Sequence, residues 1–242
     1  YAQNKLEKFR KLNKDYLFPS FDTIAGSGSN GAIVHYRANK KTTKKIEQND
    51  ILLIDSGGQY HYGTTDVTRT ISFSKQNKFI KNTYTKVLKG HIAVALTNLN
   101  KDNTGKKIDI RARKFLKKEG LDYAHGTGHG VGFFLNVHEG PQSISKYNSI
   151  KIKNGMILSN EPGFYKKNNF GIRIENLVYA KETKRNFKFE NLTLAPLEKD
   201  LINYELLNKE EKNYLFKYHL NIYSKFSSLL NKKERRWLAT LI

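Results

Sequence analysis

The pattern of hydrophobic and polar positions divides the chain into helical and extended segments that alternate. Apolar residues recur every three to four positions, as in amphipathic helices, over residues 3–14, 79–99 and 108–118 and twice more after residue 200. Short apolar or alternating runs, typical of buried strands, occupy residues 51–54, 65–73, 156–159 and 171–179. We therefore expect a single α+β domain spanning residues 1–242, in which residues from about 200 to 242 form a helical C-terminal extension that packs on the domain or on a partner subunit.

Acidic residues stand at the ends of the predicted strands. The apolar run Ile51–Ile54 stops at Asp55, before a Ser-Gly-Gly turn, and Asp66 opens the returning strand, so both are expected on one hairpin. In the same style, the run that ends at residue 159 leads to Glu161, and the last strand carries Glu175. Two acidic hairpins separated by helices predict a core with approximate internal duplication, with the acids between its halves.

A buried group of acids requires a cation. Two carboxylates on adjacent strands repel each other, and one of them takes up a proton unless a positive charge neutralises them. His129 is the one nitrogen donor that we add to the four acids, and the chain has no cysteine, so the ligand set is rich in oxygen. Such a set suits Mn²⁺ or Mg²⁺, tolerates Co²⁺, Fe²⁺ or Zn²⁺, and fits two metal ions better than one tetrahedral zinc.

The segment HGTGHGVG places two histidines four residues apart, as zinc-binding helices do. Three glycines within five residues make a helix costly, so we predict an extended or looped segment whose backbone approaches a ligand closely. Four of the seven histidines lie in glycine-flanked or strand-end settings, whereas the other three occupy helical patterns or a turn and are interpreted as structural or surface residues. The first group is His35, His125, His129 and His138, and the second is His61, His91 and His219.

Composition narrows the choice of partners. The net charge of +21 is carried mostly by lysines scattered in loops among asparagines, which favours a general lysine and asparagine bias over a nucleic-acid surface. No apolar run reaches the length of about 18 residues that spans a bilayer, so no membrane association is expected. The chain begins at Tyr1 within a helical pattern and is interpreted as a piece of a longer protein. A cytoplasmic location is expected, and an upstream signal stays open.

The five motifs DSGGQYHYGTTDVTRT, HGTGHGVG, NVHEGP, NEPGFY and FGIRIEN resemble the catalytic domain of aminopeptidase P, or X-Pro aminopeptidase. The resemblance covers nearly the whole chain and is greatest to the cytosolic eukaryotic form of this pita-bread metallopeptidase. It implies a pseudo-twofold α+β fold, a homodimer and two divalent ions, most often Mn²⁺. It also implies removal of the N-terminal residue from peptides with proline at the second position. Full-length eukaryotic members carry two upstream domains that this chain lacks.

The resemblance also implies a role for each site residue. Asp55 would chelate one metal, Asp66 and Glu175 would bridge both, and His129 and Glu161 would complete the other. Glu161 would be the general base toward a water held between the metals. His35, His125 and His138 would hold the substrate, stabilise the tetrahedral intermediate and shape the proline pocket. Arg173, read as lying two residues before Glu175 on the same strand face, would contact a carboxylate of the site and help bind substrate, although a purely structural role stays open.

Three alternatives remain at this point. Prolidase has the same ligand set but cleaves X-Pro dipeptides. Methionine aminopeptidase fits the NVHEGP and FGIRIEN contexts poorly. A pita-bread domain without activity could serve as a protein-binding module, and the lysine-rich surface would suit that role, but such a module has no physical reason to retain clustered acids.

Overall fold

The computed structural model describes all 242 residues, and helices and strands alternate along them as the sequence predicts. The five α-helices are α1 (Ala2–Arg10), α2 (Lys78–Ala95), α3 (Gly105–Lys117), α4 (Lys209–Phe226) and α5 (Lys232–Ala239). The strands are β1 (Tyr16–Pro19), β2 (Ile24–Ser27), β3 (Ile51–Ser56), β4 (Gly58–Tyr60), β5 (Gly63–Thr64), β6 (Val67–Ser72), β7 (Gly128–His129), β8 (Ser143–Ile144), β9 (Ile157–Asn160), β10 (Gly163–Lys166), β11 (Phe170–Arg173), β12 (Asn176–Glu182) and β13 (Phe187–Asn191).

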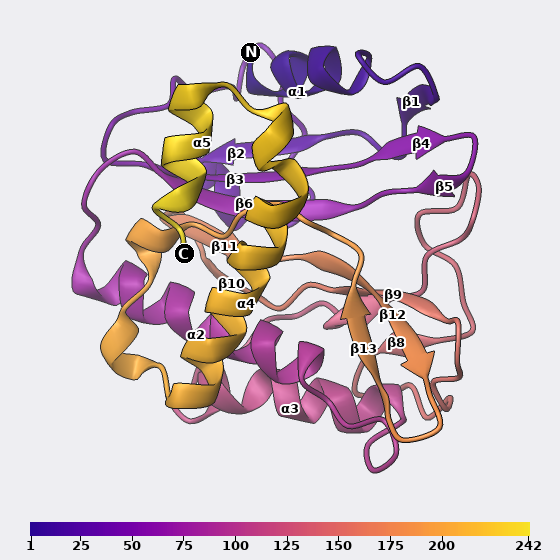
Figure 1. Ribbon diagram of the computed structural model, residues 1–242. Coiled ribbons are helices and arrows are strands. Elements are labelled where there is room, and N and C mark those ends of the chain that lie inside the picture. Colours follow the sequence, from indigo (N-terminus) through magenta and orange to yellow (C-terminus); the bar gives the residue numbers. More distant parts are fainter.

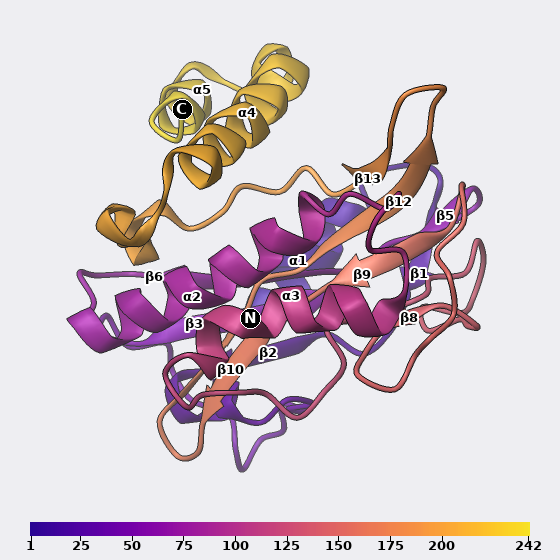
Figure 2. The same cartoon turned by 90° about the horizontal axis from the view of Figure 1, so that it is seen from below.

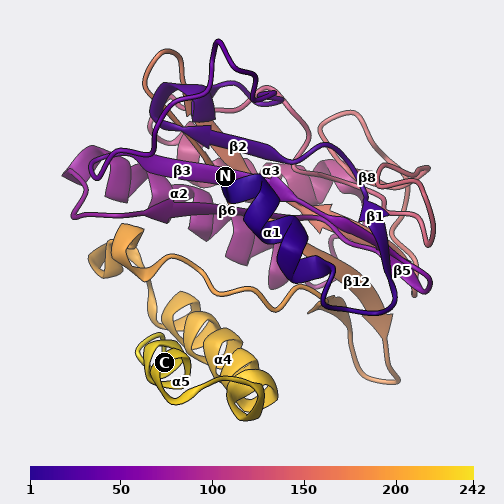
Figure 3. The same cartoon turned by 90° about the horizontal axis from the view of Figure 1, so that it is seen from above.

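Two three-stranded antiparallel sheets form the centre of the molecule. One has the order β2-β3-β6 and the other the order β13-β12-β9. Helices α2 and α3 lie side by side on one side of these strands (Figures 1 and 2), and α1 lies along the opposite side, near β2 (Figure 3). None of the five helices is both long and apolar enough to cross a bilayer.

Helix α2 links the two parts of the hydrophobic core. Its buried residues Tyr84, Val87 and Leu88 belong to a cluster of 19 side chains that includes strands β10 and β11 and the C-terminal helices. Further along the same helix, Val94 packs in a second cluster of 11 side chains, with α3, β9, β12 and β13. The helical spacing of these apolar residues therefore determines how both halves pack on one element.

The two sheets repeat one pattern, and this confirms the predicted duplication. In the first, β3 pairs with β6, and the connection between them contains the small hairpin β4–β5. In the second, β9 pairs with β12, and the connection contains the hairpin β10–β11. An acid lies near the end of the first strand, Asp55 inside β3 and Glu161 just after β9, and another lies immediately before the returning strand, Asp66 in one half and Glu175 in the other.

Two predicted strand boundaries are wrong. Strand β3 continues past Ile54 to Ser56, because it is the central strand and pairs on both sides at Asp55. The chain then enters β4 where a turn was expected, so Asp55 lies inside a strand and Asp66 just before one, with a second hairpin between them. The predicted strand over residues 171–179 is two strands in different sheets, since the chain bends at Ile174 and Glu175. Glu175 directs its backbone N–H to the carbonyl of Thr68 in β6, at 3.1 Å.

The C-terminal extension packs on the domain itself. Leu215, Tyr218 and Ile222 of α4 are buried in the larger core cluster, and Leu238 of α5 joins them. The Tyr218 hydroxyl accepts a hydrogen bond from the buried guanidinium of Arg69, at 3.1 Å. Because Arg69 also donates to the carbonyl of Glu175, at 2.6 Å, one side chain connects α4 to the bend between β11 and β12.

Two histidines outside the cavity are buried, as predicted for structural residues. The ring of His91 lies 3.1 Å from the carbonyl of Asn160, and that of His219 accepts a hydrogen bond from the backbone N–H of Leu197, at 3.2 Å. Burial lowers the pKa of His91 to about 3 and that of His219 to about 4. Protonation of His219 would replace the acceptor that Leu197 uses by a donor.

We predict a pH-dependent contribution of His219 to stability. Its folded pKa lies below the ordinary value of about 6.5, so the unfolded chain takes up this proton first as the pH falls. The free energy of unfolding should therefore fall between about pH 6.5 and pH 4, with His219 contributing up to about 1.4 kcal/mol per pH unit. Denaturant titrations across this range should show that the free energy of unfolding changes less steeply with pH in His219→Gln than in wild type. His61→Gln, on an exposed turn, is the matched control, and equal slopes for wild type and His219→Gln would contradict the prediction.

Candidate metal centre

A single cavity of about 470 Å³ between the two half-domains is lined by all nine predicted site residues. They come from the β3–β6 half, the β9–β12 half, the segment around β7 and the loop after the 3₁₀ helix Gly28–Ala32. The nine are His35, Asp55, Asp66, His125, His129, His138, Glu161, Arg173 and Glu175. The sequence therefore identified the wall of one cavity, although the residues lie up to 140 positions apart (175 − 35).

The acids form two overlapping groups with the geometry of metal ligands. Asp55, Asp66 and Glu175 each offer a carboxylate oxygen within 4.8 Å of the others, and so do the donor atoms of His129, Glu161 and Glu175. Glu175 belongs to both groups. Asp66 forms a third such group with His129 and His138, so His138 is also within reach of the ligands. The first and second groups share Glu175, and the first and third share Asp66, so the arrangement suits two ions.

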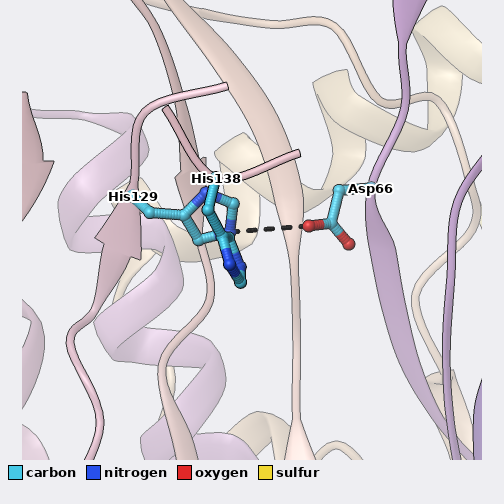
Figure 4. Close-up of side chains that lie close together, drawn as sticks. All are labelled: Asp66, His129 and His138. Atoms are coloured by element: carbon cyan, nitrogen blue, oxygen red, sulfur yellow. Dashed lines mark ion pairs between the residues drawn. The ribbon is translucent and has the colours of Figure 1, made fainter. Parts of the chain in front are cut away.

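His129 reaches the acids because its backbone is held close to β9. Its N–H donates to the Ser159 hydroxyl at 2.9 Å, and a Cβ on the preceding Gly128 would collide with the Ser159 carbonyl, so only glycine permits this approach. Nε2 of His129 lies 3.5 Å from Asp66 and 3.4 Å from Glu161. Figure 4 shows the His129 imidazole directed at the Asp66 carboxylate, with the ring of His138 beside it. The segment is extended, as its glycines predicted.

Burial and mutual repulsion oppose ionisation of these acids. Burial raises the pKa of Asp66 well above its ordinary value, and the nearby charges of Asp55 and Glu161 raise it further. Burial, followed by repulsion from Asp66, does the same to the pKa of Glu175, and burial raises the pKa of Glu161. Divalent cations would offset both effects, since they interact with the charged form of every acid in the group.

The unpartnered oxygens of the cluster fit such cations. Asp55 Oδ1 and Asp66 Oδ1 are buried and accept no hydrogen bond, although buried polar atoms nearly always have a partner. Both atoms belong to residues of the first ligand group. Four carboxylates and one imidazole form a hard, oxygen-rich donor set, so the residues present are suited to hold divalent ions.

Arg173 contacts a carboxylate of the cluster. Its buried guanidinium donates through Nη2 to Asp55 Oδ2 at 2.6 Å, through Nη1 to the Tyr165 hydroxyl at 2.6 Å, and through Nε to the Thr68 hydroxyl at 3.1 Å. It lies at the end of β11, however, and Glu175 lies beyond that strand, so the two do not share a strand face. Arg173 therefore lines the cavity with its guanidinium bound to protein groups.

The three other predicted histidines have different surroundings. His125 is held at both ring nitrogens: Nδ1 donates to the Gly126 carbonyl at 2.7 Å, which leaves Nε2 to accept from the Tyr165 hydroxyl at 2.8 Å. Burial lowers its pKa to about 4, so the ring is neutral at pH 7. His35 is exposed on the cavity rim, and His138 packs edge-on against His129 with 4.0 Å between ring centroids.

Three side chains that form hydrogen bonds with side chains of the predicted site residues escaped prediction. Tyr165 connects Arg173 to His125, the Thr68 hydroxyl donates to Glu175 at 2.8 Å, and the Ser159 hydroxyl donates to Glu161 at 3.1 Å. Ser159 stands two residues before Glu161 on β9, a spacing that could have indicated a shared strand face. Nothing in the local sequence distinguishes Tyr165 or Thr68 from ordinary strand residues.

Comparison with protein families identifies the class. The family model described as metallopeptidase family M24 matches residues 1–182, and the model for the C-terminal region of the same family matches residues 185–241. The chain belongs to metallopeptidase family M24, and its structure is the α+β pita-bread fold of that family.

Individual relatives support a narrower grouping. A protein of Coccidioides posadasii named probable Xaa-Pro aminopeptidase P is 46% identical over 250 aligned positions, covering 98% of this chain and 41% of that protein. The crystal structure of an X-prolyl aminopeptidase from Caenorhabditis elegans, described as a cytosolic enzyme with a di-nuclear active site, is 36% identical. It matches with a TM-score of 0.90 over 99% of this chain and 41% of that one. Prolidase from Pyrococcus furiosus is 33% identical, with a TM-score of 0.70 over 79% of this chain and 54% of that one.

The aminopeptidase P relatives are longer than this chain. The chain spans about two fifths of the length of the aminopeptidase P relatives that it matches.

We predict that Asp66→Asn changes stability in opposite directions with and without metal. In chelator, the substitution removes a buried, repelling acid, so the melting temperature should rise by roughly 2–4 °C for each kcal/mol gained. With Mn²⁺, wild type should gain stability by mass action, and the variant should gain much less. Thermal unfolding with and without the ion measures both effects. Asp22→Asn, an exposed carboxylate on the same cavity, is the control, and an equal Mn²⁺ shift in wild type and Asp66→Asn would contradict a role in metal binding.

Proposed function

We propose that this chain is the catalytic domain of an X-Pro aminopeptidase that hydrolyses the N-terminal X-Pro bond of peptides. The observation that carries the proposal is the cavity itself, where two overlapping groups of metal-ligand geometry meet four further side chains, His35, His125, His138 and Arg173. The similarity to proteins named Xaa-Pro aminopeptidase P over nearly the whole chain supports the same function. Residues 1–242 would form one catalytic domain, joined in the full protein to upstream domains.

In the proposed reaction Asp55, Asp66, His129, Glu161 and Glu175 would hold the two ions, and Asp66 and Glu175 would be available to both. When bound, divalent ions polarise a peptide carbonyl and lower the pKa of a nearby water. Glu161 would take the proton from the attacking water and pass it to the proline nitrogen as the C–N bond breaks. Its position suits this role, because Glu161 is partly exposed to the cavity, at 17% of its side-chain surface, while Ser159 and His129 hold it in place.

Preference for proline requires a pocket that does not depend on a backbone donor. An X-Pro bond lacks the N–H that most peptidases bind, so shape and imidazole contacts must replace that hydrogen bond. The cavity offers apolar walls at Phe21, Val34 and Val137 beside the rings of His35 and His138. We assign the proline ring to this wall, and the substrate would pack against the ring of His125, which Tyr165 holds in place.

Several finer features belong to the proposal. Mn²⁺ is the ion we favour, because the donor set is rich in oxygen. A homodimer is inferred from the resemblance to aminopeptidase P. A cytoplasmic location is supported by the likeness to the nematode enzyme, which is described as cytosolic. Peptides with proline at the second position are the proposed substrates.

Prolidase activity is the second candidate, because the prolidase of Pyrococcus furiosus has the same fold at 33% identity. The two activities differ in substrate length. We predict release of arginine from Arg-Pro-Pro at least about tenfold faster than cleavage of the dipeptide Arg-Pro, measured with Mn²⁺-loaded protein. Preferred cleavage of the dipeptide would favour prolidase. Absence of cleavage of both peptides, with two ions bound per chain, would favour a protein-binding module.

We predict that Glu161→Gln lowers kcat by about two to four orders of magnitude, the range for loss of a positioned base, while the fold is retained. Steady-state kinetics on Arg-Pro-Pro and circular dichroism measure the two parts of this prediction. Glu182→Gln, an exposed residue at the end of β12, is the matched control and should keep wild-type kinetics. A kcat within threefold of wild type for Glu161→Gln would contradict the assignment of the base.

A further inference from the structure

We propose that Arg113 and Asp109 of α3 are positioning residues for the reaction. Their side chains bind residues 123–127 from α3, and this segment orients both His125 and Glu161. The proposal rests on the proposed function, because it assigns those two residues to the chemistry. It concerns a buried ion pair that lies outside the ligand groups.

Arg113 directs both of its terminal nitrogens, Nη1 and Nη2, to residues 122–125. Its Nη1 donates to the carbonyl of Tyr123 at 2.7 Å, and its Nη2 donates to the carbonyl of His125 at 2.6 Å. Nη1 also donates to Asp122 at 2.8 Å, and the guanidinium lies 3.9 Å from the centroid of the Tyr123 ring. Two carbonyls and one ring of the same segment are thus fixed by one planar group, a geometry that the point charge of lysine cannot reproduce.

Asp109 holds Arg113 and the far end of the segment together. Its two oxygens accept from Arg113 Nε at 2.9 and 2.8 Å, and Oδ1 also accepts from the Thr127 hydroxyl at 2.6 Å. Since the carboxylate is only an acceptor, the Thr127 proton is committed to it, and the Tyr123 hydroxyl must donate to Thr127, at 2.5 Å. The directions of all these hydrogen bonds are therefore fixed.

The segment in turn fixes two groups of the cavity, the backbone of Glu161 and the ring of His125. The carbonyl of Thr127 accepts from the backbone N–H of Glu161 at 2.8 Å, which fixes the proposed base. The peptide between Gly126 and Thr127, next to the one whose His125 carbonyl Arg113 binds, supplies the Gly126 carbonyl that accepts from Nδ1–H of the His125 ring. That bond leaves Nε2 as the acceptor for Tyr165, so the orientation of this peptide sets the tautomer of His125.

Stability alone is a poor explanation of this ion pair. The side chain of Asp109 is 1% exposed and that of Arg113 is 7% exposed, and burying both charges costs free energy that their attraction only partly offsets. Apolar side chains could fill the same space beneath α3. They could not bind two carbonyls of the segment that leads to His125, which is the geometric contribution of the pair.

The test compares Arg113→Lys with Arg111→Lys. Arg111 lies on the same helix and forms an ion pair with Asp102 at 3.1 Å, but it forms no hydrogen bond or ion pair with residues 123–127, so its variant is the matched control. Thr127→Val is a second variant that keeps the ion pair and the side-chain shape and removes only the hydroxyl. Each protein is loaded with metal and assayed for bound ions, melting temperature, and kcat and KM on Arg-Pro-Pro. The ¹⁵N shifts of the His125 ring are recorded in Zn²⁺-loaded protein, with His125→Gln to assign them.

The expected results separate positioning from folding. Arg113→Lys should lower kcat about 10- to 100-fold, as a small misplacement of reacting groups does, with KM within about twofold, two ions bound, and ring shifts moved toward a tautomer mixture. Thr127→Val should lower kcat about 3- to 10-fold, and Arg111→Lys should match wild type.

Two results would overturn the proposal: unchanged kcat and ring shifts in both Arg113→Lys and Thr127→Val, or activity lost only in proportion to lost metal. If wild type cleaves no X-Pro peptide, the proposed function fails, and the ring shifts alone decide the positioning role.

Discussion

Four carboxylates from two half-domains meet in one buried cluster, and the rest of the structure depends on how their repulsion is balanced. Each half contributes its acids next to a small hairpin, so the duplicated topology is what brings Asp55 and Asp66 against Glu161 and Glu175. Arg173 balances part of the charge on Asp55, at 2.6 Å. The unpartnered oxygens of Asp55 and Asp66 that remain are suited to bind cations, so the topology that brings the acids together also creates the candidate metal centre.

The parts of the site that depend on local sequence were predictable. A polar residue that interrupts an apolar run must be paired or must bind something, and Asp55 at the end of such a run signals this directly. Likewise, the glycines around His129 exclude a helix and permit the close contact with Ser159. The helices were predicted to within a few residues for the same reason, since their apolar spacing is local.

The parts that failed depend on contacts between distant segments. The bend at Glu175 exists because its N–H bonds to Thr68, 107 positions earlier (175 − 68), so the alternation of residues 171–179 looked like one strand. Tyr165 and Thr68 act through partners, His125 and Glu175, that only the fold brings near, and their own neighbours in sequence carry no sign of it. Sequence reasoning thus found nine residues that line one cavity and missed the side chains that hold them.

The segment from residue 123 to 129 is constrained on both sides, which accounts for its unusual composition. On one side Arg113 and Asp109 bind its carbonyls and hydroxyl, and on the other Gly128 lies against β9 so that His129 reaches the acids. Flexible glycines would be a poor support for a reacting group if the chain relied on their own conformational preference. Because buried charges bind the carbonyls of Tyr123 and His125 and the hydroxyl of Thr127, the glycines serve close approach, and rigidity comes from α3. The side chains that this segment places in the cavity are therefore held by α3, a helix that contributes no residue to the cavity wall.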